Sequence, residues 1–362
     1  MNKQRSLSVD IAKGIAIIAI VLGHINFAYP HLTLVMTEDF LFRLWHVPIF
    51  FILGGFFIRE EQLNQPVSWF NKKFFSLYLK ILYFYIPAIL LHNVFINIGW
   101  YSISSTDPII NVYSITDFIK HILLTICLAG REPIVGPMWF VYVLFIALIG
   151  LSITSWGIGK LVKDTQQRQY ILFIVLLGLT TVSGILSNKY GLTLRRFSNV
   201  FTAMILIQIG WLMNRKFCFK YDNLFIAVIC AMIGFEVACM LGGVALNANE
   251  YKDITQLIIA SPAILYCIMY MGKKIENTLI GKGLAKVGRE SFYIMALHLA
   301  GMKICTMSLR AVNLGGGTLV ELTPNVGNNI FLLITYLSFG VCIPLLFIFF
   351  FRKIKYVIIN FK

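Results

Sequence analysis

The sequence has few charged residues and few interruptions in its apolar stretches. Only 13% of its 362 residues are charged and 58% are hydrophobic, whereas a soluble domain is about a quarter charged. The mean hydropathy is +0.79. Lipid offers the backbone no hydrogen-bond partners, and the apolar runs are long and continuous rather than alternating, so helices are favoured over a barrel. The composition therefore predicts an all-α polytopic membrane protein and excludes a sizeable soluble domain.

Recognisable metal, repeat and low-complexity patterns are also lacking. The seven cysteines are scattered, mostly in apolar stretches, and none shows CxxC or metal-ligand spacing. We interpret them as packing residues and predict no metal site. The net charge of +15 would suggest nucleic acid in a soluble protein, but the distribution of the basic residues explains it differently.

A helix needs about 20 apolar residues to cross a bilayer, and about ten segments of the sequence meet this need. Residues 117–130 are apolar but short, so we expect an interfacial or re-entrant helix there. The predicted spans are residues 7–28, 40–58, 74–98, 138–156, 170–186, 196–213, 223–246, 255–271, 288–304 and 328–351.

The loops between these spans differ in basic residues. With the N-terminus inside, the cytoplasmic loops and tails hold 20 Lys and Arg, and the outer loops hold 8. This asymmetry fits the positive-inside rule and predicts that both termini are cytoplasmic. No loop is large enough for a core of its own, so we expect residues 1–362 to form one membrane domain.

The first predicted span carries Asp10, Lys13 and His24. Lys13 and His24 are 11 residues apart, about three helical turns, so they share one helix face about 16 Å apart along the axis. Asp10 lies one turn from Lys13, close enough to pair with it. Ionisable groups at membrane depth are costly, which indicates function: a cation on the inner side and a proton-transfer group on the outer side. The simpler alternatives are that Lys13 snorkels and that His24 only hydrogen-bonds between helices.

The second predicted span begins with Arg43 and His46, one helical turn apart. His46 lies at a depth similar to that of His24, so the two can share a level. Arg43 sits near the outer edge, where it is a ligand contact or an interfacial anchor. Pro48 and the pair Gly54–Gly55 allow a bend or a close helix approach, and packing explains the glycines.

Later spans hold further candidates. Trp139 begins the fourth span, where an aromatic belt residue is the alternative to a ligand contact. Arg289 and Ser291 lie at the cytoplasmic edge of the ninth span, and His298 lies deeper in it. Glu236, within the seventh span, suits an ion relay or a hydrogen bond to a neighbouring helix.

Several segments together resemble the acyltransferase-3 family of bacterial membrane O-acyltransferases, in particular its sugar O-acetyltransferase, fucose 4-O-acetylase-like branch. They occur in the family's order over nearly the whole chain. Lys13 stands where the family usually has arginine. Lysine keeps the positive charge but lacks the planar guanidinium group of arginine. The segments are Leu7–Gly14, Val21–His24, Trp45–Phe56, Pro137–Phe140 and Val287–Ile294, followed by His298.

The resemblance implies transfer of an acyl group, acetyl above all, from cytoplasmic acyl-CoA to a hydroxyl of a cell-surface glycan or its lipid-linked precursor. Acyl-CoA is then a substrate rather than a permanently bound cofactor, and the protein spans the bacterial inner membrane several times. His24 would act as base or carry the acyl group, with Lys13 and His46 also catalytic. The expected substrate-binding residues are Asp10, Arg43, Trp139, Arg289, Ser291 and His298.

Two other classes stay open beside the enzyme. A transporter or flippase for a lipid-linked or anionic substrate would also have about ten helices with buried charges. Inverted repeats would favour it, and we see none. A membrane scaffold would leave the shared face of Lys13 and His24 unexplained. We expect the lipid bilayer as a partner, and no nucleic acid.

Overall fold

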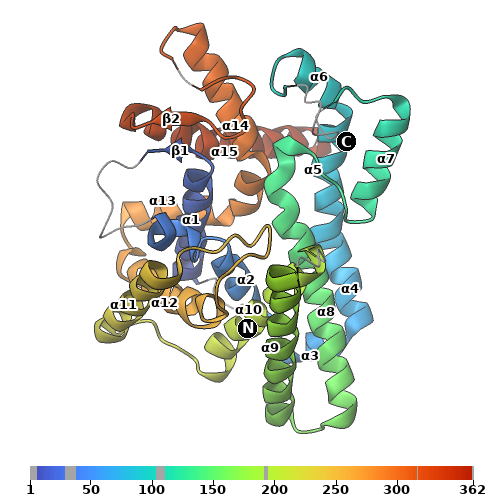
Figure 1. Ribbon diagram of the computed structural model, residues 1–362, viewed down its shortest axis with the longest axis vertical. Coiled ribbons are helices and arrows are strands. Elements are labelled where there is room, and N and C mark those ends of the chain that lie inside the picture. The colour runs from blue at the N-terminus through green and yellow to red at the C-terminus, as the bar shows by residue number, and fades with distance from the viewer. Residues whose placement is uncertain (1–5, 29–37, 103–110, 191–194, 316, 361–362) are drawn as a thin grey trace. The chain divides into compact units, whose positions relative to one another are not determined.

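A computed structural model describes residues 6–28, 38–102, 111–190, 195–315 and 317–360, and these residues are predominantly helical (Figure 1). Among them, 7 helices are long and apolar enough to cross a membrane. The all-α polytopic prediction is therefore confirmed, while ten spans and cytoplasmic termini remain predictions. The seven helices are Pro66–Leu90, Pro133–Leu161, Thr165–Leu186, Leu224–Leu241, Gln256–Ile275, Ser291–Ala311 and Ile330–Ile354.

The three other predicted spans are short or broken. Helices α1 (Leu7–Gly23) and α10 (Arg195–Trp211) have 17 residues each. Residues 40–58 do not form one helix: the π-helix η1 (Asp39–Arg43) is followed by turns and then by α2 (Pro48–Gly55). Pro48 is the first residue of α2, where its missing N–H costs no helical hydrogen bond. Hydropathy detects the apolar stretch but not this interruption.

The chain divides into two compact units, which we describe separately. The first unit comprises residues 1–16, 33–79 and 139–285. It contains the start of α1, together with η1, α2 and α10. Its other elements are α3 (Glu60–Leu63), α4 (Pro66–Lys73), η2 (Phe74–Tyr78), α8 (Trp139–Leu161), α9 (Thr165–Tyr190), η5 (Leu212–Lys216), α11 (Leu224–Leu241), η6 (Gln256–Ala260), α12 (Ser261–Ile275) and most of α13 (Leu279–Arg289).

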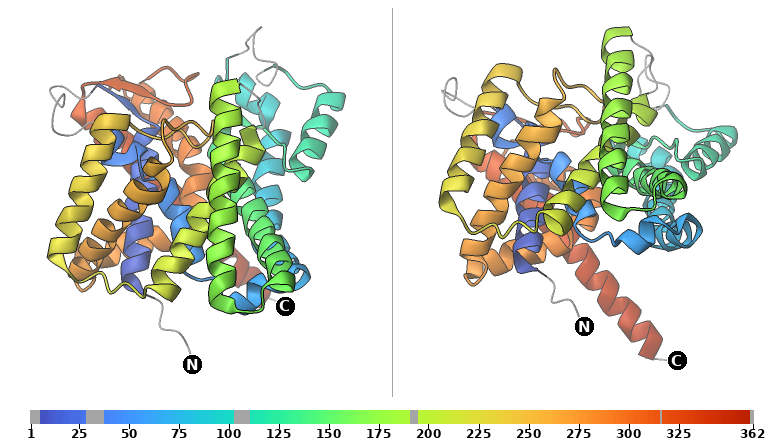
Figure 2. Two further views of the ribbon diagram at one scale, coloured as in Figure 1. Left: turned by 60° about the horizontal axis from the view of Figure 1, so that its bottom comes forward. Right: turned by 90° about the horizontal axis from the view of Figure 1, so that it is seen from below.

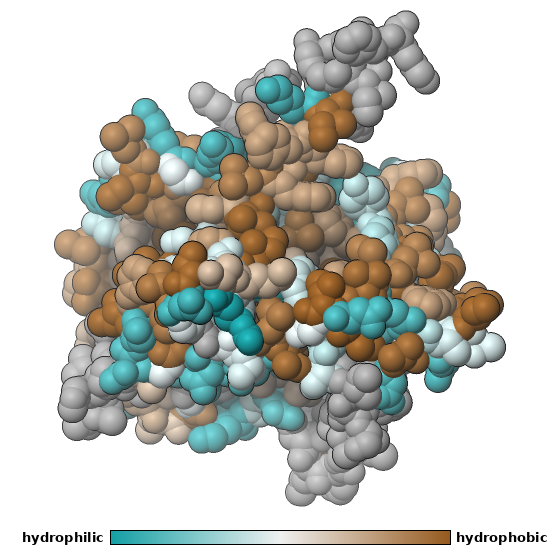
Figure 3. Space-filling view, turned by 90° about the horizontal axis from the view of Figure 1, so that it is seen from above, coloured by the Kyte–Doolittle hydropathy of each residue, from teal (hydrophilic) through white to brown (hydrophobic). Residues whose placement is uncertain are grey.

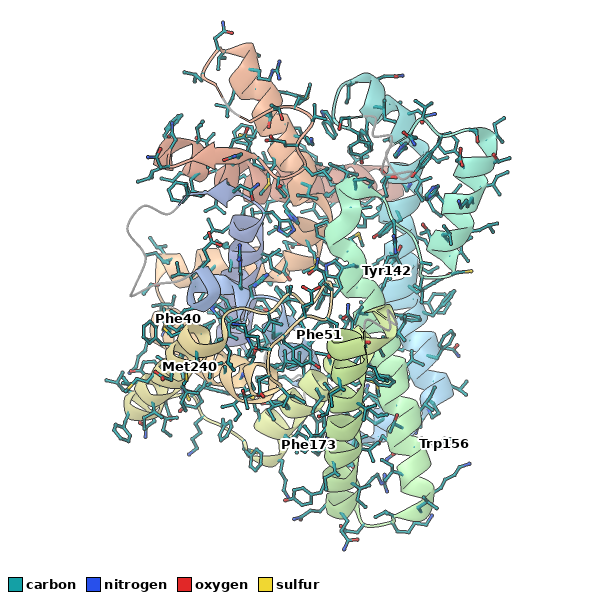
Figure 4. All side chains as sticks on the ribbon, viewed as in Figure 1. Phe40, Phe51, Tyr142, Trp156, Phe173 and Met240 are labelled. Carbon is teal, nitrogen blue, oxygen red and sulfur yellow. The ribbon has the colours of Figure 1, made fainter. Side chains whose placement is uncertain are left out.

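The core of the first unit is built on a close crossing of α2 and α10. A Cβ atom on Gly55 would collide with the carbonyl oxygen of Ile207, and one on Gly210 with that of Ile52. Packing therefore does explain Gly55, as the sequence suggested. Helices α8 and α9 run side by side in this unit (Figures 1 and 2). Buried Phe51 of α2 is labelled in Figure 4.

The second unit comprises residues 17–32, 80–138 and 286–362. Its two long helices, α14 (Ser291–Ala311) and α15 (Ile330–Asn360), approach closely. A Cβ on Gly301 of α14 would lie 2.7 Å from the carbonyl oxygen of Phe339 of α15. Buried Tyr336 lies 2.9 Å from the hydroxyl of Thr306, hydroxyl to hydroxyl. The elements of this unit are the end of α1, β1 (Asn26–Phe27), nearly all of α5 (Leu79–Leu90), α6 (His92–Asn97), α7 (Ile115–Ile126), η4 (Pro133–Met138), α14 (Ser291–Ala311), β2 (Asn325–Gly327) and α15 (Ile330–Asn360).

Helix α7 occupies most of the stretch expected to be interfacial or re-entrant. It has 12 residues and is capped at its N-terminus by Ser114, whose hydroxyl accepts from the Asp117 N–H. At 1.5 Å per residue it is about 18 Å long, short of the roughly 30 Å hydrocarbon core. Its Ile119 and Leu123 are more than half exposed.

Apolar residues also form broad areas of the face seen in Figure 3, as lipid-contacting surfaces require.

Candidate active site

The first unit contains a cavity of about 700 Å³ beside Lys13, which we call the Lys13 cavity. Its volume falls in the range of about 300–1,000 Å³ that is usual for small-molecule and cofactor sites. Half-buried Lys13 and buried Asp10, one helical turn apart, both line it from α1. The lining residues are Ser6, Ser8, Val9, Asp10, Lys13, Phe56, Phe57, Asn214, Phe219, Lys220, Tyr221, Met269, Lys273 and Glu276.

Cations and aromatic rings share the walls of the Lys13 cavity. The Lys13 ammonium lies 4.9 Å from the ring centroid of Phe57. Lys273 of α12 donates to the carbonyl oxygen of Lys220 at 3.1 Å, and its ammonium lies 3.6 Å from Asp222. Three lysines in a cavity that is also lined by aromatic side chains suit a ligand that carries both negative charge and a flat ring.

The loop between η5 and α11 forms one wall, and its backbone is unusual. Cys218 and Tyr221 have φ values of +49° and +52°, although neither is glycine. Such conformations cost free energy and concentrate at functional sites. Burial raises the pKa of the Tyr221 phenol, and among the described residues its hydroxyl has no hydrogen-bond partner. The loop therefore holds an unsatisfied polar group at the cavity.

His24 belongs to the second unit and follows directly after α1. Its backbone N–H donates to the carbonyl of Val21 in a closing turn. Its ring Nδ1 lies 2.8 Å from the carbonyl oxygen of Ile20. A carbonyl oxygen can only accept, so Nδ1 carries the proton and the Nε2 of the neutral ring is left with a lone pair. In the neutral His24 ring, Nε2 is therefore the atom that can accept a proton.

His298 of α14 lies against His24, with ring centroids 4.9 Å apart in an edge-on arrangement. The Nδ1 of His298 is 2.9 Å from the carbonyl oxygen of Ile294 and 3.1 Å from that of Met295. The ring is completely buried. The structure thus brings together two histidines that the sequence singled out separately, and we call them the histidine pair.

A small sheet anchors the chain after His24. Strands β1 and β2 pair in parallel, and the Ala28 N–H donates to the Gly327 carbonyl at 2.7 Å. One turn before His24, Val21 packs against Gly340 of α15, where a Cβ would lie 2.7 Å from its side chain. The backbone on both sides of His24 is therefore held by the second unit itself.

The remaining candidates of the first unit lie in less specific surroundings. Arg43 ends η1 and pairs with Glu38 at 2.6 Å, with 56% of its side chain exposed. His46 is half-buried in the turn before α2. Because His46 and His24 belong to different units, their common depth stays a prediction. Trp139, half-buried, is the first residue of α8.

The candidates predicted to lie at the cytoplasmic edge surround an ion pair. Arg352 of α15 binds Glu290 through two hydrogen bonds of 2.7 and 2.8 Å. Exposed Arg289 ends α13 and half-buried Ser291 begins α14, on either side of Glu290. Glu236 lies on the exposed side of α11.

Two buried polar groups of the second unit were not recognised from sequence. Lys303 is 1% exposed and donates to the carbonyl oxygens of Trp100, Leu319 and Glu321. The predicted span closes at residue 304, next to Lys303, whereas α14 continues to Ala311. Its position in a largely apolar stretch was the available signal.

The second group is a sealed cluster around His92 and Glu132, whose side chains are fully buried and 3.1 Å apart. The Tyr101 hydroxyl donates to Glu132 at 2.8 Å, and burial together with this carboxylate raises the pKa of Tyr101. The His92 ring stacks on Tyr113, with centroids 3.6 Å apart. These residues are far apart in sequence, and no motif connects them.

Comparison with known proteins gives one result. A family model described as an acyltransferase domain, that of the acyltransferase-3 family, matches residues 6–351. No curated protein and no solved structure matches the chain.

Proposed function

Because the chain belongs to the acyltransferase-3 family over residues 6–351 and is therefore a membrane acyltransferase, we propose that it is an O-acetyltransferase. In this proposal an acetyl group passes from cytoplasmic acetyl-CoA to a hydroxyl of a cell-surface glycan or of its lipid-linked precursor. The protein would act in the bacterial inner membrane, in the sugar O-acetyltransferase branch that its motifs resemble.

The orientation of His24 is the observation that carries the proposal. A hydroxyl is a poor nucleophile until a base takes its proton, and imidazole suits that task near neutral pH. The contact of 2.8 Å between Nδ1 and the Ile20 carbonyl leaves Nε2 as the basic atom. The hydroxyl oxygen attacks the acyl carbon, the carbon–sulfur bond breaks, and the proton passes through Nε2 to the leaving thiolate.

The Lys13 cavity supports acyl-CoA as the donor. Coenzyme A has phosphate groups and an adenine ring, which correspond to the lysines and aromatic rings of this cavity. Lys13, Lys220 and Lys273 would face the phosphates, and Phe57 offers an exposed ring for stacking. Asp10 would position Lys13 from one helical turn away.

Mass spectrometry of the host's surface glycans tests the proposal. Cells with the gene should carry acetylated glycans, each heavier by one acetyl group, and cells without the gene should lack them. Restoring the wild-type gene should restore the mass, whereas the His24→Gln variant at equal expression should not. Identical glycans in all strains would contradict the proposal and favour a transporter.

A further inference from the structure

Lys303 of α14 is a buried charged group of the second unit that the proposed mechanism does not use. Its side chain is 1% exposed, and its Nζ donates to the carbonyl oxygens of Trp100 at 2.8 Å, Leu319 at 2.5 Å and Glu321 at 2.7 Å. A neutral amine has two N–H bonds and an ammonium has three, so three carbonyl acceptors indicate the charged form. Burying a charge is costly unless its donors are paired. Lys303 therefore joins α14 to two segments that are distant from each other in sequence.

Two of the three carbonyls belong to residues 317–327, which we call the 317–327 segment. Its first residue, Gly317, donates its N–H to the Tyr336 hydroxyl of α15 at 3.2 Å. The segment folds back on itself, since a Cβ on Gly317 would lie 3.4 Å from the backbone nitrogen of Asn325. The segment is thus held at its start by α15 and in its middle by Lys303.

The 317–327 segment ends in strand β2, which lies beside β1 (Figure 1). The Asn26 N–H donates to the carbonyl oxygen of Pro324 at 2.9 Å, three residues after Glu321. His24 lies two residues before Asn26 and just beyond Gly23, the last residue of α1. Because His24 stands between the end of a helix and this sheet, a displacement of the segment would shift the main chain that carries the imidazole.

We propose that Lys303 is a positioning residue for His24: its ammonium fixes the 317–327 segment, the segment fixes β1, and β1 fixes the place of the imidazole. This inference rests on the proposed function, in which His24 is the base. Lys303 touches neither the substrates nor the reacting atoms in this role, and it takes no part in the proton transfer. Its contribution is to the rate at which bound substrates react.

Lys303→Met keeps a long side chain and removes all three donors. Because a misplacement of about 1 Å can cost about 100-fold in rate, this variant should lower kcat for acetyl transfer by about 10- to 100-fold. The residues proposed to bind the donor belong to the first unit. The KM for acetyl-CoA should therefore stay within about twofold of the wild-type value.

The experiment uses the full chain in lipid nanodiscs, with radiolabelled acetyl-CoA and a panel of octyl hexosides as acceptors. Rates are normalised to the amount of folded protein, measured by thermal unfolding. Lys303→Gln keeps two N–H donors and should recover part of the lost kcat. Thr125→Val is the matched control, because it removes a buried hydrogen bond of the same unit that lies within α7. It should leave kcat and KM within about twofold of wild type.

A double-mutant cycle separates the positioning of His24 from a general loss of structure. In the His24→Gln background there is no base to position. Lys303→Met should then lower the remaining rate by no more than about twofold. A general structural defect would instead lower the rate by the same factor in both backgrounds.

The inference is wrong, while the proposed function stands, if folded Lys303→Met keeps the wild-type kcat, changes KM alone, or loses the same factor in both backgrounds. If Lys303→Met does not fold, Lys303→Gln is judged by the same comparisons. Loss of folding in both variants would assign Lys303 a purely structural role and would also contradict the inference. If wild type acetylates no hexoside of the panel, the proposed function fails and takes this inference with it.

Discussion

The Lys13 cavity and the histidine pair differ in how their polar groups are held. The cavity is open, and its cations sit on long side chains such as Lys220 and Lys273, which are exposed or nearly so. In the histidine pair, each imidazole ring is held by a backbone carbonyl four residues earlier in the chain, that of Ile20 for His24 and that of Ile294 for His298. The cavity can adjust to a large flexible ligand, whereas the pair fixes single atoms in advance. Binding tolerates adaptable groups, and proton transfer requires preorganised ones.

Removing the preorganised base should have the largest effect. His24→Gln keeps some hydrogen-bonding capacity but cannot accept a proton, so acetyl transfer should fall by about 10²–10⁴-fold. The measurement is radiolabelled transfer from acetyl-CoA by purified protein with unchanged thermal unfolding. His46→Gln is the companion control, and equal loss there would mean that two histidines are essential. Near-normal transfer by His24→Gln would contradict the role of base.

Removing an adaptable cation should have a smaller effect, confined to donor binding. Lys13→Ala should raise the KM for acetyl-CoA by about 10-fold or more, since a hydrogen bond to a charged group contributes roughly 1.5–3 kcal/mol. Lys13→Arg keeps the charge and should retain most of the affinity. Equal KM values for wild type and Lys13→Ala, at matched folded protein, would mean that Lys13 only snorkels.

Tyr221→Phe tests whether the strained loop belongs to the donor site. Loss of one neutral hydrogen bond is worth about 0.5–1.5 kcal/mol, so the KM for acetyl-CoA should rise about two- to tenfold. Thermal stability should not fall, because the buried hydroxyl has no partner among the described residues. Tyr266→Phe, whose ring touches Tyr221 outside the cavity lining, should leave KM unchanged. Similar KM changes in both variants would indicate a packing effect instead.

Arg43→Ala should have the smallest effect of the four. Its exposed pair with Glu38 belongs to a class worth about 0–1 kcal/mol. We expect transfer and melting temperature within about twofold and a few degrees of wild type. A large loss of transfer would support the prediction that Arg43 contacts substrate and would extend the site beyond the two regions compared above.

Sequence spacing was sufficient where a single helix carries the information. The 3.6-residue period put Asp10 and Lys13 on one turn, and both line the Lys13 cavity. The contact between His24 and His298 was not predictable, because it depends on how distant helices pack. The left-handed backbone at Tyr221 was equally hidden, since propensity assigns that conformation to glycine. The interruption between η1 and α2 at residues 44–47 was not predicted, because a hydropathy window averages over turn residues.

The burial of Lys303 affects experiments that map the protein's sidedness with amine-reactive reagents. Its ammonium is enclosed by three carbonyl oxygens and has almost no contact with solvent. A reagent added from either side would leave Lys303 unlabelled, so the absence of labelling at this residue carries no information on topology. Lys120 of α7 and Lys252, both exposed, are the informative lysines for labelling the face predicted to lie outside.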